Sequence, residues 1–300
     1  MSVWVCGEVL IDILPTGAVV GGGPANTAKA LARLGCGVQF IGGISTDAYG
    51  QRVCAELTQD GVGLELSHAS DKPTCTATVS ISDSGVASYK FLIDGTATFD
   101  FDSSWLPDPE KFKPSALYIG TLATIIQPGA SQLFGWALQV SEFAPIIFDP
   151  NVRSSVLGDR EKYCAVIEKW AAISSVIKVS DGDLSWLYPD ETPSEIANRW
   201  IAGGCALVVV TRGARGLIGF TQSGYEEVAG VATKVVDTVG AGDTVGAIIV
   251  EGVIKDSVAA LHGVVLSETL HRAAVAAAIT CSRIGAQPPR SHELMEALRK

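Results

Sequence analysis

Two glycine-rich clusters each lead into a segment of helical pattern and carry side chains suited to binding a polar ligand. In the first, residues 235–246 read VVDTVGAGDTVG, so that a Gly-Ala-Gly turn opens an apolar helix with Asp243 in its first turn. Backbone N–H groups at such a helix start, together with the helix dipole, bind a phosphate or stabilise developing negative charge. The alternatives are a tight turn formed by the glycines alone and an Asp243 that only caps the helix.

The second cluster lies near the N-terminus, where residues 21–26 read GGGPAN ahead of a helical segment at 27–34. Three glycines let a backbone approach a ligand closely, and Pro24 suits the first turn of a helix. Asn26 can exchange hydrogen bonds with hydroxyl groups, unless it faces water. Asp12 is an acid among apolar neighbours, where it either caps a turn or binds a polyhydroxylated ligand.

Several common nucleotide and metal sites are absent from the sequence. The chain has no Gly-Lys pair and therefore no G-x-x-x-x-G-K-[ST] phosphate loop. Gly240, Gly242 and Gly246 are spaced G-x-G-x-x-x-G, one residue too long for the dinucleotide motif, which disfavours a Rossmann dehydrogenase. The four histidines have no ligand spacing, so we expect no histidine metal centre.

Composition narrows the class of protein further. With 47% hydrophobic and 18% charged residues in a chain of 300, the sequence predicts a large buried core and excludes a disordered chain. A net charge of −10 repels phosphate backbones and anionic lipid, so we expect neither a nucleic-acid nor a membrane partner. Seven cysteines without a C-x-x-C pair indicate reduced thiols and a cytoplasmic protein. The sequence shows no signal-peptide pattern and no apolar run of roughly 18–20 residues.

The elements that must position these groups follow from short apolar runs rich in Val and Ile. Such unalternated runs are typical of strands covered on both faces, and helical spacing lies between them, which predicts an α/β fold around a mostly parallel sheet. The expected strands are residues 3–6, 38–41, 116–119, 145–148, 176–179 and 206–210.

Residues 74–101 behave differently, because polar and apolar side chains alternate along them. This pattern predicts a small antiparallel sheet with one solvated face, with a hairpin turn at Asp83-Ser84-Gly85 and a further strand at about 13–20. We interpret it as a lid over a cleft. Residues 264–279 are expected to form a core helix.

At this point the sequence resembles a known family, the ribokinase-like (PfkB-type) carbohydrate kinases. GGGPANTAKALARLG and DTVGAGD are similar to the two signatures of that family, and the likeness spans nearly the whole chain. GEVLIDILP, DGTA and DPNVR look most like the corresponding segments of fructokinases. The other matching segments, in order, are GGISTDAYG at 42–50, KVSDGDLSWL at 178–187, VVVTRGARG at 208–216 and IGAQPP at 284–289.

The resemblance implies a fold and an activity. The fold would be a three-layer α/β/α sandwich around the mostly parallel sheet, a single domain over residues 1–300 with a β-sheet lid at about 13–20 and 74–101. The activity would be transfer of the ATP γ-phosphoryl group to a hydroxyl of a free sugar, with fructose converted to fructose 6-phosphate. The alternatives are another ribokinase-like sugar kinase, such as a 2-keto-3-deoxygluconate kinase with Arg153 and Lys90 facing the carboxylate, and a non-catalytic sugar or nucleotide sensor.

The same resemblance assigns roles to individual residues. Asp243 would be the catalytic base. The backbone amides that follow Gly240, those of Ala241, Gly242 and Asp243, would form an anion hole. The sugar would be held by Asp12, Gly22, Gly23 and Asn26, with Arg153 in the cleft. The nucleotide site would be lined by Thr211, Gly213 and Gly216, together with Ser180 and Asp183, which stand where the family often has Asn-x-x-Glu. Backbone carbonyls around Asp237 and Val239, with Gly285, would form a monovalent-cation loop.

The remaining expectations concern cofactors, partners and nearby charges. The resemblance implies ATP, Mg²⁺ and K⁺, and an apolar lid face would allow a homodimer. A carboxylate at a helix start stays ionised at pH 7, so Asp243 is expected to be a weak base. Lys178 and Arg215 are interpreted as surface charges, and Asp149 as a turn former with an indirect role.

Overall fold

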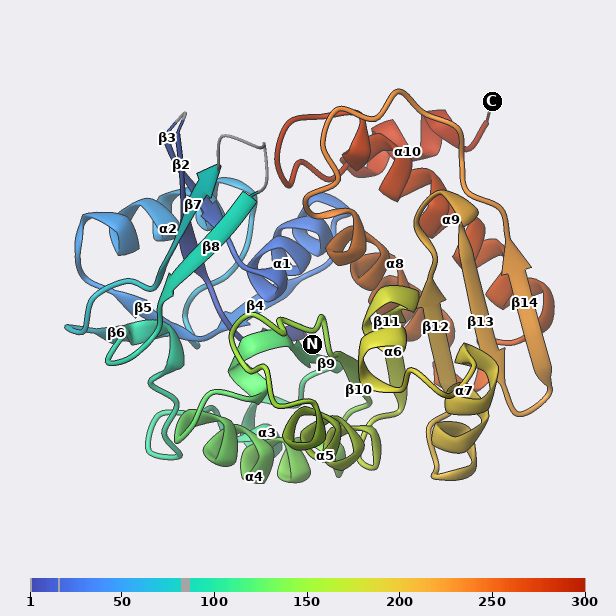
Figure 1. Cartoon of the computed structure of the whole chain (residues 1–300), viewed down its shortest axis with the longest axis horizontal. Helices are drawn as coiled ribbons and strands as arrows, with labels where there is room; N and C mark the ends of the chain where they lie inside the picture. The colour runs from blue at the N-terminus through green and yellow to red at the C-terminus, as the bar shows by residue number, and fades with distance from the viewer. Residues whose placement is uncertain (1, 16, 82–86, 300) are drawn as a thin grey trace.

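The computed structural model describes residues 2–15, 17–81 and 87–299, and a large sheet lies at its centre (Figure 1). Its eight strands are parallel except at one edge, where β13 is antiparallel to both of its neighbours. The six predicted strands all form and begin within one residue of their expected positions. In spatial order the strands are β4 (Val38–Ile41), β1 (Val3–Cys6), β9 (Ala116–Gly120), β10 (Ile146–Asp149), β11 (Val176–Ser180), β12 (Leu207–Thr211), β13 (Leu217–Thr221) and β14 (Gly224–Val228).

Helices cover both faces of this sheet and bury two separate cores. In β1, Val3 and Val5 pack into one core, whereas Trp4 and Cys6 pack into the other, as the alternation of a strand requires. The predicted three-layer sandwich is therefore confirmed (Figure 1). One layer holds α1 (Gly23–Arg33), α2 (Ala48–Gln59), α8 (Ala241–Asp256), α9 (Gly263–Cys281) and α10 (Ser291–Ala297). The other holds α3 (Pro109–Phe112), α4 (Gly129–Ser141), α5 (Arg160–Ala171), α6 (Asp181–Leu187) and α7 (Pro193–Ala202).

A small separate sheet stands beside α1 and α2 in the order β3 (Gly17–Gly21), β2 (Leu10–Leu14), β7 (Thr76–Ile81) and β8 (Ala87–Leu92) (Figure 1). Its two outer pairings are antiparallel, but β2 and β7 pair in parallel, so the sheet is mixed rather than antiparallel as predicted. Residues 93–101 lie outside this sheet, and the expected turn at Asp83-Ser84-Gly85 falls outside the described residues. A second small sheet pairs β5 (Gly43–Ser45) with β6 (His68–Ser70).

The predicted core helix at residues 264–279 is α9. Among the described residues it is the one helix long and apolar enough, by length and composition, to cross a membrane. Leu266 and Leu270 on it are fully buried, and both lie close to Gly219 of β13. The helix also packs on α8 and β14. A core helix passes the same length and hydropathy criteria, and these contacts are those of a core helix.

Candidate active site

The start of α8 carries the first half of the site. Gly240 caps this helix with a φ of 78°, and a Cβ there would lie 2.6 Å from the Cβ of Ala286, so the position requires glycine. The amide of Ala241 donates to the Thr238 carbonyl at 3.3 Å. Within the described residues the amides of Gly242 and Asp243 have no acceptor. These two N–H groups lie at the positive end of a 16-residue helix, an arrangement that can bind an anion.

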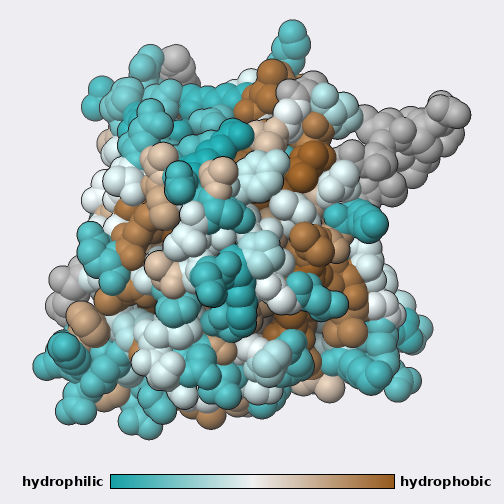
Figure 2. Space-filling model, turned by 90° about the vertical axis from the view of Figure 1, so that its left-hand side faces the viewer, coloured by the Kyte–Doolittle hydropathy of each residue, from teal (hydrophilic) through white to brown (hydrophobic). Residues whose placement is uncertain are grey.

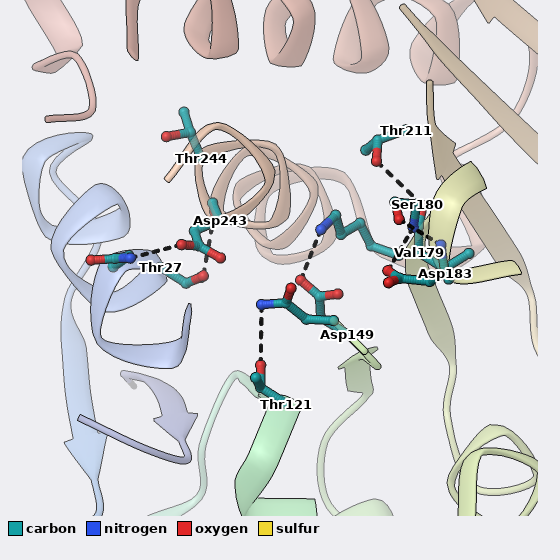
Figure 3. Close-up of polar contacts among 12 residues, drawn as sticks. Thr27, Thr121, Asp149, Val179, Ser180, Asp183, Thr211, Asp243 and Thr244 are labelled. Atoms are coloured by element: carbon teal, nitrogen blue, oxygen red, sulfur yellow. Dashed lines mark hydrogen bonds and ion pairs between the residues drawn. The ribbon is translucent and has the colours of Figure 1, made fainter. Parts of the chain in front are cut away.

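Asp243 lies beside that anion site with its carboxylate turned toward α1 (Figure 3). It is 8% exposed, its side chain does not cap the helix, and Oδ2 accepts a hydrogen bond of 2.8 Å from Asn26 Nδ2. Thr27 Oγ1 donates to the Asp243 carbonyl at 3.3 Å. Burial raises the pKa of Asp243 to about 6, although Lys178 and Asn26 oppose the rise. The carboxylate is thus a stronger base than the sequence predicts, and it remains ionised above neutral pH.

The start of α1 forms the facing half of the site. A Cβ on Gly23 would lie 2.9 Å from Asn151 Nδ2, 3.1 Å from Thr121 Oγ1 and 3.3 Å from Asp243 Oδ1. Three polar groups from distant parts of the chain therefore surround the small space that this glycine leaves open. Thr121 and Asn151 have φ values of 59° and 37°, an uncommon backbone conformation that recurs at functional sites. Sequence reasoning missed Thr121, whose neighbours give no signal, and Asn151, which belongs to the DPN turn.

The other glycines of the GGGPAN cluster face the protein rather than that space. A side chain on Gly21 would collide with the Asp12 carboxylate, and one on Gly22, whose φ is 109°, would come within 2.6 Å of the Glu8 carbonyl oxygen. Asp12 lies on β2, where burial raises its pKa and the charge of Arg153 lowers it. The cluster therefore brings Asp12 and the chain at Glu8 against α1, and Gly23 alone borders the open space.

Arg153 and Glu8 add a cation and a further acid to the same region. Arg153 Nη1 donates to Asn151 Oδ1 at 2.7 Å, and its charge lowers the pKa values of Glu8, Asp12 and Asp243. Glu8 is 1% exposed and accepts a 3.2 Å bond from the amide of Ala123. Burial raises the pKa of Glu8 to about 7. Sequence reasoning missed Glu8, although an acid between apolar strand residues is a signal that could have found it.

A buried ion pair lies next to the start of α8. Lys178 on β11 is 4% exposed, and its Nζ is 2.9 Å from Oδ2 of Asp149 at the end of β10 (Figure 3). Tyr118 donates its hydroxyl to the same oxygen at 2.8 Å. The interpretation of Lys178 as a surface charge is wrong, because the strand VIKVS is covered on both faces. Arg215, in contrast, is exposed and pairs with Asp181. Asp149 is fully buried, and its Oδ1 has no partner among the described residues.

The residues expected at the nucleotide follow β11 and β12, which lie side by side. Ser180 and Thr211 are partners across these strands. Ser180 and Asp183 form the capping box of α6, and the other oxygen of Asp183 accepts the Val152 amide at 3.2 Å. Both carboxylate oxygens of Asp183 therefore accept hydrogen bonds from backbone N–H groups. Burial raises the pKa of Asp183.

Gly213 and Gly216 lie in the turn between β12 and β13. Their φ values are 56° and 89°, and a side chain on Gly216 would collide with the Val228 carbonyl. Glycine is thus required there for the close approach of the following chain.

The predicted cation loop is held together by Asp237. One carboxylate oxygen accepts the amide of Val239 at 3.0 Å, and the other accepts the amide of Gly285 at 2.9 Å. Gly285 has a φ of 69°, and its neighbour Ala286 touches the Gly240 turn. The three residues named from the sequence are therefore brought together directly behind the start of α8, with the carboxylate bound internally.

Comparison with known proteins agrees with this fold. Residues 16–293 match the model of the pfkB family carbohydrate kinases. The chain is 33% identical over 261 residues to a fructokinase of Rhizobium leguminosarum bv. trifolii, covering 84% of this chain and 79% of that one.

Solved structures of two further fructokinases are similar throughout. The Xylella fastidiosa fructokinase with bound ATP has a TM-score of 0.92 at 24% identity, over 99% of this chain and 98% of that one. The Vibrio cholerae O395 fructokinase, in its fructose, ADP and calcium ion bound form, has a TM-score of 0.85 at 28% identity over 99% of each chain. A double mutant of it was solved with fructose, ADP and potassium ion, and has a TM-score of 0.87 at 26% identity, over 99% of this chain and 98% of that one.

Together the three-layer sandwich, the small sheet beside it and the facing helix starts define a ribokinase-like kinase fold. The chain belongs to the pfkB family of carbohydrate kinases.

Proposed function

We propose that this kinase is a fructokinase, which transfers the γ-phosphoryl group of ATP to the 6-hydroxyl of fructose. The observation that carries the proposal is the buried Asp243 carboxylate, held by Asn26 beside the amides of Gly242 and Asp243, which have no acceptor in the described part of the chain. A base and an anion site on one helix turn are what phosphoryl transfer to a hydroxyl needs. The fructokinase relatives support fructose as the acceptor.

In this mechanism Asp243 receives the proton of the sugar hydroxyl. Asn26 occupies Oδ2, which leaves Oδ1 beside the space at Gly23 for the hydroxyl. With a pKa of about 6 the carboxylate is mostly ionised above pH 7 and close enough to neutrality to act as a general base. The two amides stabilise the charge on the transferred group, and the leaving group is ADP.

The sugar would lie between the helix starts and the small sheet. Gly23 and Asn26 border this space at the α1 start, Asp12 lies on β2 of the small sheet, and Arg153 donates to Asn151 beside Gly23. Gly22 faces the Glu8 carbonyl and would act by shaping the loop. The surrounding acids Glu8, Asp12 and Asp243 favour a neutral sugar over a keto-deoxy acid, because a substrate carboxylate would face three carboxyl groups with one nearby guanidinium. The small sheet serves as the lid of a single kinase domain and excludes water when it closes.

ATP would be bound across the ends of β11 and β12, at Ser180, Thr211, Gly213 and Gly216. Mg²⁺ enters with ATP and usually binds one or two carboxylates and the phosphates, keeping several waters. The unpartnered Oδ1 of Asp149 fits that role, whereas Asp183 could reach the ion only through water, since both its oxygens accept N–H groups. Bound there, the ion neutralises phosphate charge.

Potassium would bind at backbone carbonyls of the loops that Asp237 ties together around Val239 and Gly285. We expect turnover in KCl to exceed turnover in tetramethylammonium chloride at equal ionic strength. Equal rates in the two salts would remove K⁺ from the proposal.

The partners of the proposal are the sugar and ATP, in the cytoplasm. All seven cysteines are free, which suits a reducing compartment. On the face that carries the small sheet, apolar surface forms separate patches among hydrophilic residues (Figure 2). Val19 and Leu92 of that sheet are 40% and 53% exposed, which offers apolar surface to a second copy of the chain. The homodimer through the lid stays a prediction, and analytical sedimentation can check it.

The decisive experiment is a sugar panel with ATP and Mg²⁺, followed by ADP release. Fructose should give the highest kcat/KM, and Asp243→Asn should lower kcat by about 10³-fold or more while fructose still binds. Release with keto-deoxy acids alone would overturn fructose as the acceptor. Absence of ADP with every sugar, with binding retained, would indicate a sensor instead.

A further inference from the structure

The mechanism above leaves one buried charge without a task. The side chain of Lys178 is only 5% exposed, yet a Cβ on Gly242 would lie 3.1 Å from its Nζ. The ammonium group therefore lies against the first turn of α8, where the amides of Gly242 and Asp243 have no acceptor among the described residues. Within the described residues, Asp149 is its one hydrogen-bond partner, and an ammonium has three donors.

The surroundings keep this lysine charged and fixed. Asp149 raises the pKa of Lys178 against the effect of burial, and Tyr118 donates to the oxygen that Lys178 also contacts. The charge also reaches Asp243, whose pKa it lowers. Burying two ions is costly, and replacing such a pair with apolar residues is often neutral or stabilising. A buried pair beside two amides that have no acceptor among the described residues is therefore better explained by a ligand than by stability alone.

We propose that Lys178 is a catalytic residue that contacts the phosphoryl group during its transfer. This inference rests on the proposed kinase function and adds a cation to its anion site. The bond from the γ-phosphorus to the bridging oxygen of ADP breaks, and a bond from that phosphorus to the sugar oxygen forms. The hydroxyl proton goes to Asp243, and Lys178 keeps its own proton throughout. Its charge offsets that on the equatorial oxygens of the transferred group.

The test separates this role from a purely structural partnership with Asp149. Lys178→Met should lower kcat by about 10²-fold or more, as loss of a transition-state donor does, with the fructose KM and the ADP Kd changed less than about threefold. Lys255→Met is the matched control. Lys255 is exposed and lies in the last turn of α8, far from its first turn, so this variant should behave as the wild type. A Lys178→Met enzyme with near wild-type kcat would overturn the proposal.

A double-mutant cycle covers the case in which the single variant folds poorly. Lys178→Met leaves Asp149 buried and unpaired, whereas Lys178→Met with Asp149→Asn leaves no charge in the pair. A catalytic Lys178 predicts that the double variant stays at least about 30-fold below Asp149→Asn alone, given the loss expected for one donor. A structural Lys178 predicts recovery to the level of Asp149→Asn, and that result would also overturn the proposal. The proposed function fails separately, when the wild type phosphorylates no sugar.

Discussion

The two glycine-rich helix starts face each other across the site, yet they are built for different ligands. At α8, Gly240 takes a left-handed conformation, and two amides of the first turn have no acceptor among the residues that the structure describes. At α1, Pro24 occupies the first turn and has no N–H to offer, and the Gly22 carbonyl already accepts the amide of Asn26. The α8 start therefore presents two adjacent amides, whereas at α1 Pro24 separates the amides of Gly23 and Ala25, and that start presents a gap at Gly23 and the side chain of Asn26.

This difference shows that glycine content alone does not identify an anion site. Both starts are rich in glycine, but only α8 combines free amides with a nearby cation, Lys178. The α1 start is surrounded by the acids Glu8, Asp12 and Asp243 instead. The phosphoryl group and the neutral sugar are thus separated by the local sign of charge, across the hydrogen bond that joins Asn26 to Asp243.

Among changes to the backbone of the two helix starts, the largest effect should come from removing the left-handed cap of α8. In Gly240→Ala the positive φ and the approach to Ala286 at 2.6 Å would displace the first turn and its amides. We expect kcat to fall by about 10²- to 10³-fold, the loss typical of an oxyanion donor. Gly135→Ala, in the exposed middle of α4 with no neighbour within 4 Å, is the control and should leave kcat unchanged. A fall in sugar affinity alone would contradict the division between the two starts.

The buried acid next to α1 should appear in the pH dependence of stability. The folded-state pKa of Glu8 is about 7 against 4.5 for the free group, so its contribution to stability is full below 4.5 and is lost as pH rises through 7. That loss amounts to about 3 kcal/mol between pH 4.5 and 8. Glu8→Gln should therefore gain about 2.5 kcal/mol on the wild type in the free energy of unfolding in urea at pH 8 relative to pH 5. Glu110→Gln, on the exposed part of α3, should show no such change.

A methyl group in the gap at the α1 start should affect the sugar selectively. Gly23→Ala places a Cβ about 3 Å from Asn151 and Thr121, where the acceptor hydroxyl is expected. The KM for fructose should rise about tenfold, or about 1.4 kcal/mol, with the ATP KM nearly unchanged. An increase confined to the ATP KM would assign this gap to the nucleotide and reverse the comparison.

The smallest effect should follow from restoring an N–H to the first turn of α1. Pro24→Ala raises the conformational entropy of the unfolded chain and removes ring atoms that pack near Gly7. The free energy of unfolding should therefore fall by about 1 kcal/mol. The kinetic constants should stay within about twofold, because α1 lacks the neighbouring cation. Denaturant unfolding and steady-state rates on one preparation measure both quantities. Phosphate binding gained by this variant would show that proline alone distinguishes the two starts.

The main sheet could be predicted from sequence because its strands are buried on both faces. Residues 3–6 and 38–41 form β1 and β4 with the predicted bounds. The edge strands β13 and β14 were not predicted, since Gly219 lies in the middle of the five-residue β13 and Glu226 and Glu227 interrupt the apolar pattern of β14. The parallel pairing of β2 with β7 was also missed, because hairpin patterns reveal only local partners.

The site was predictable in so far as its residues belong to the two glycine clusters. Asn26 and Asp243 were named from them and are hydrogen-bonded in the structure. Lys178 and Glu8 were not named as site residues because a single charged residue in or beside an apolar strand marks a candidate without showing which element covers it. Their environment depends on packing between β11 and α8 in one case, and between β1 and the turn at Ala123 in the other.

The hydrogen bond between Asn26 and Asp243 joins residues 217 positions apart in the chain. During synthesis, α1 and the small sheet emerge early, yet their partner helix α8 leaves the ribosome only after four-fifths of the chain has been made. Contacts of such sequence separation form late, because the intervening chain must first be ordered. We therefore expect nascent chains to remain unable to bind sugar until α8 docks, with the apolar face of α1 open to chaperones in the meantime.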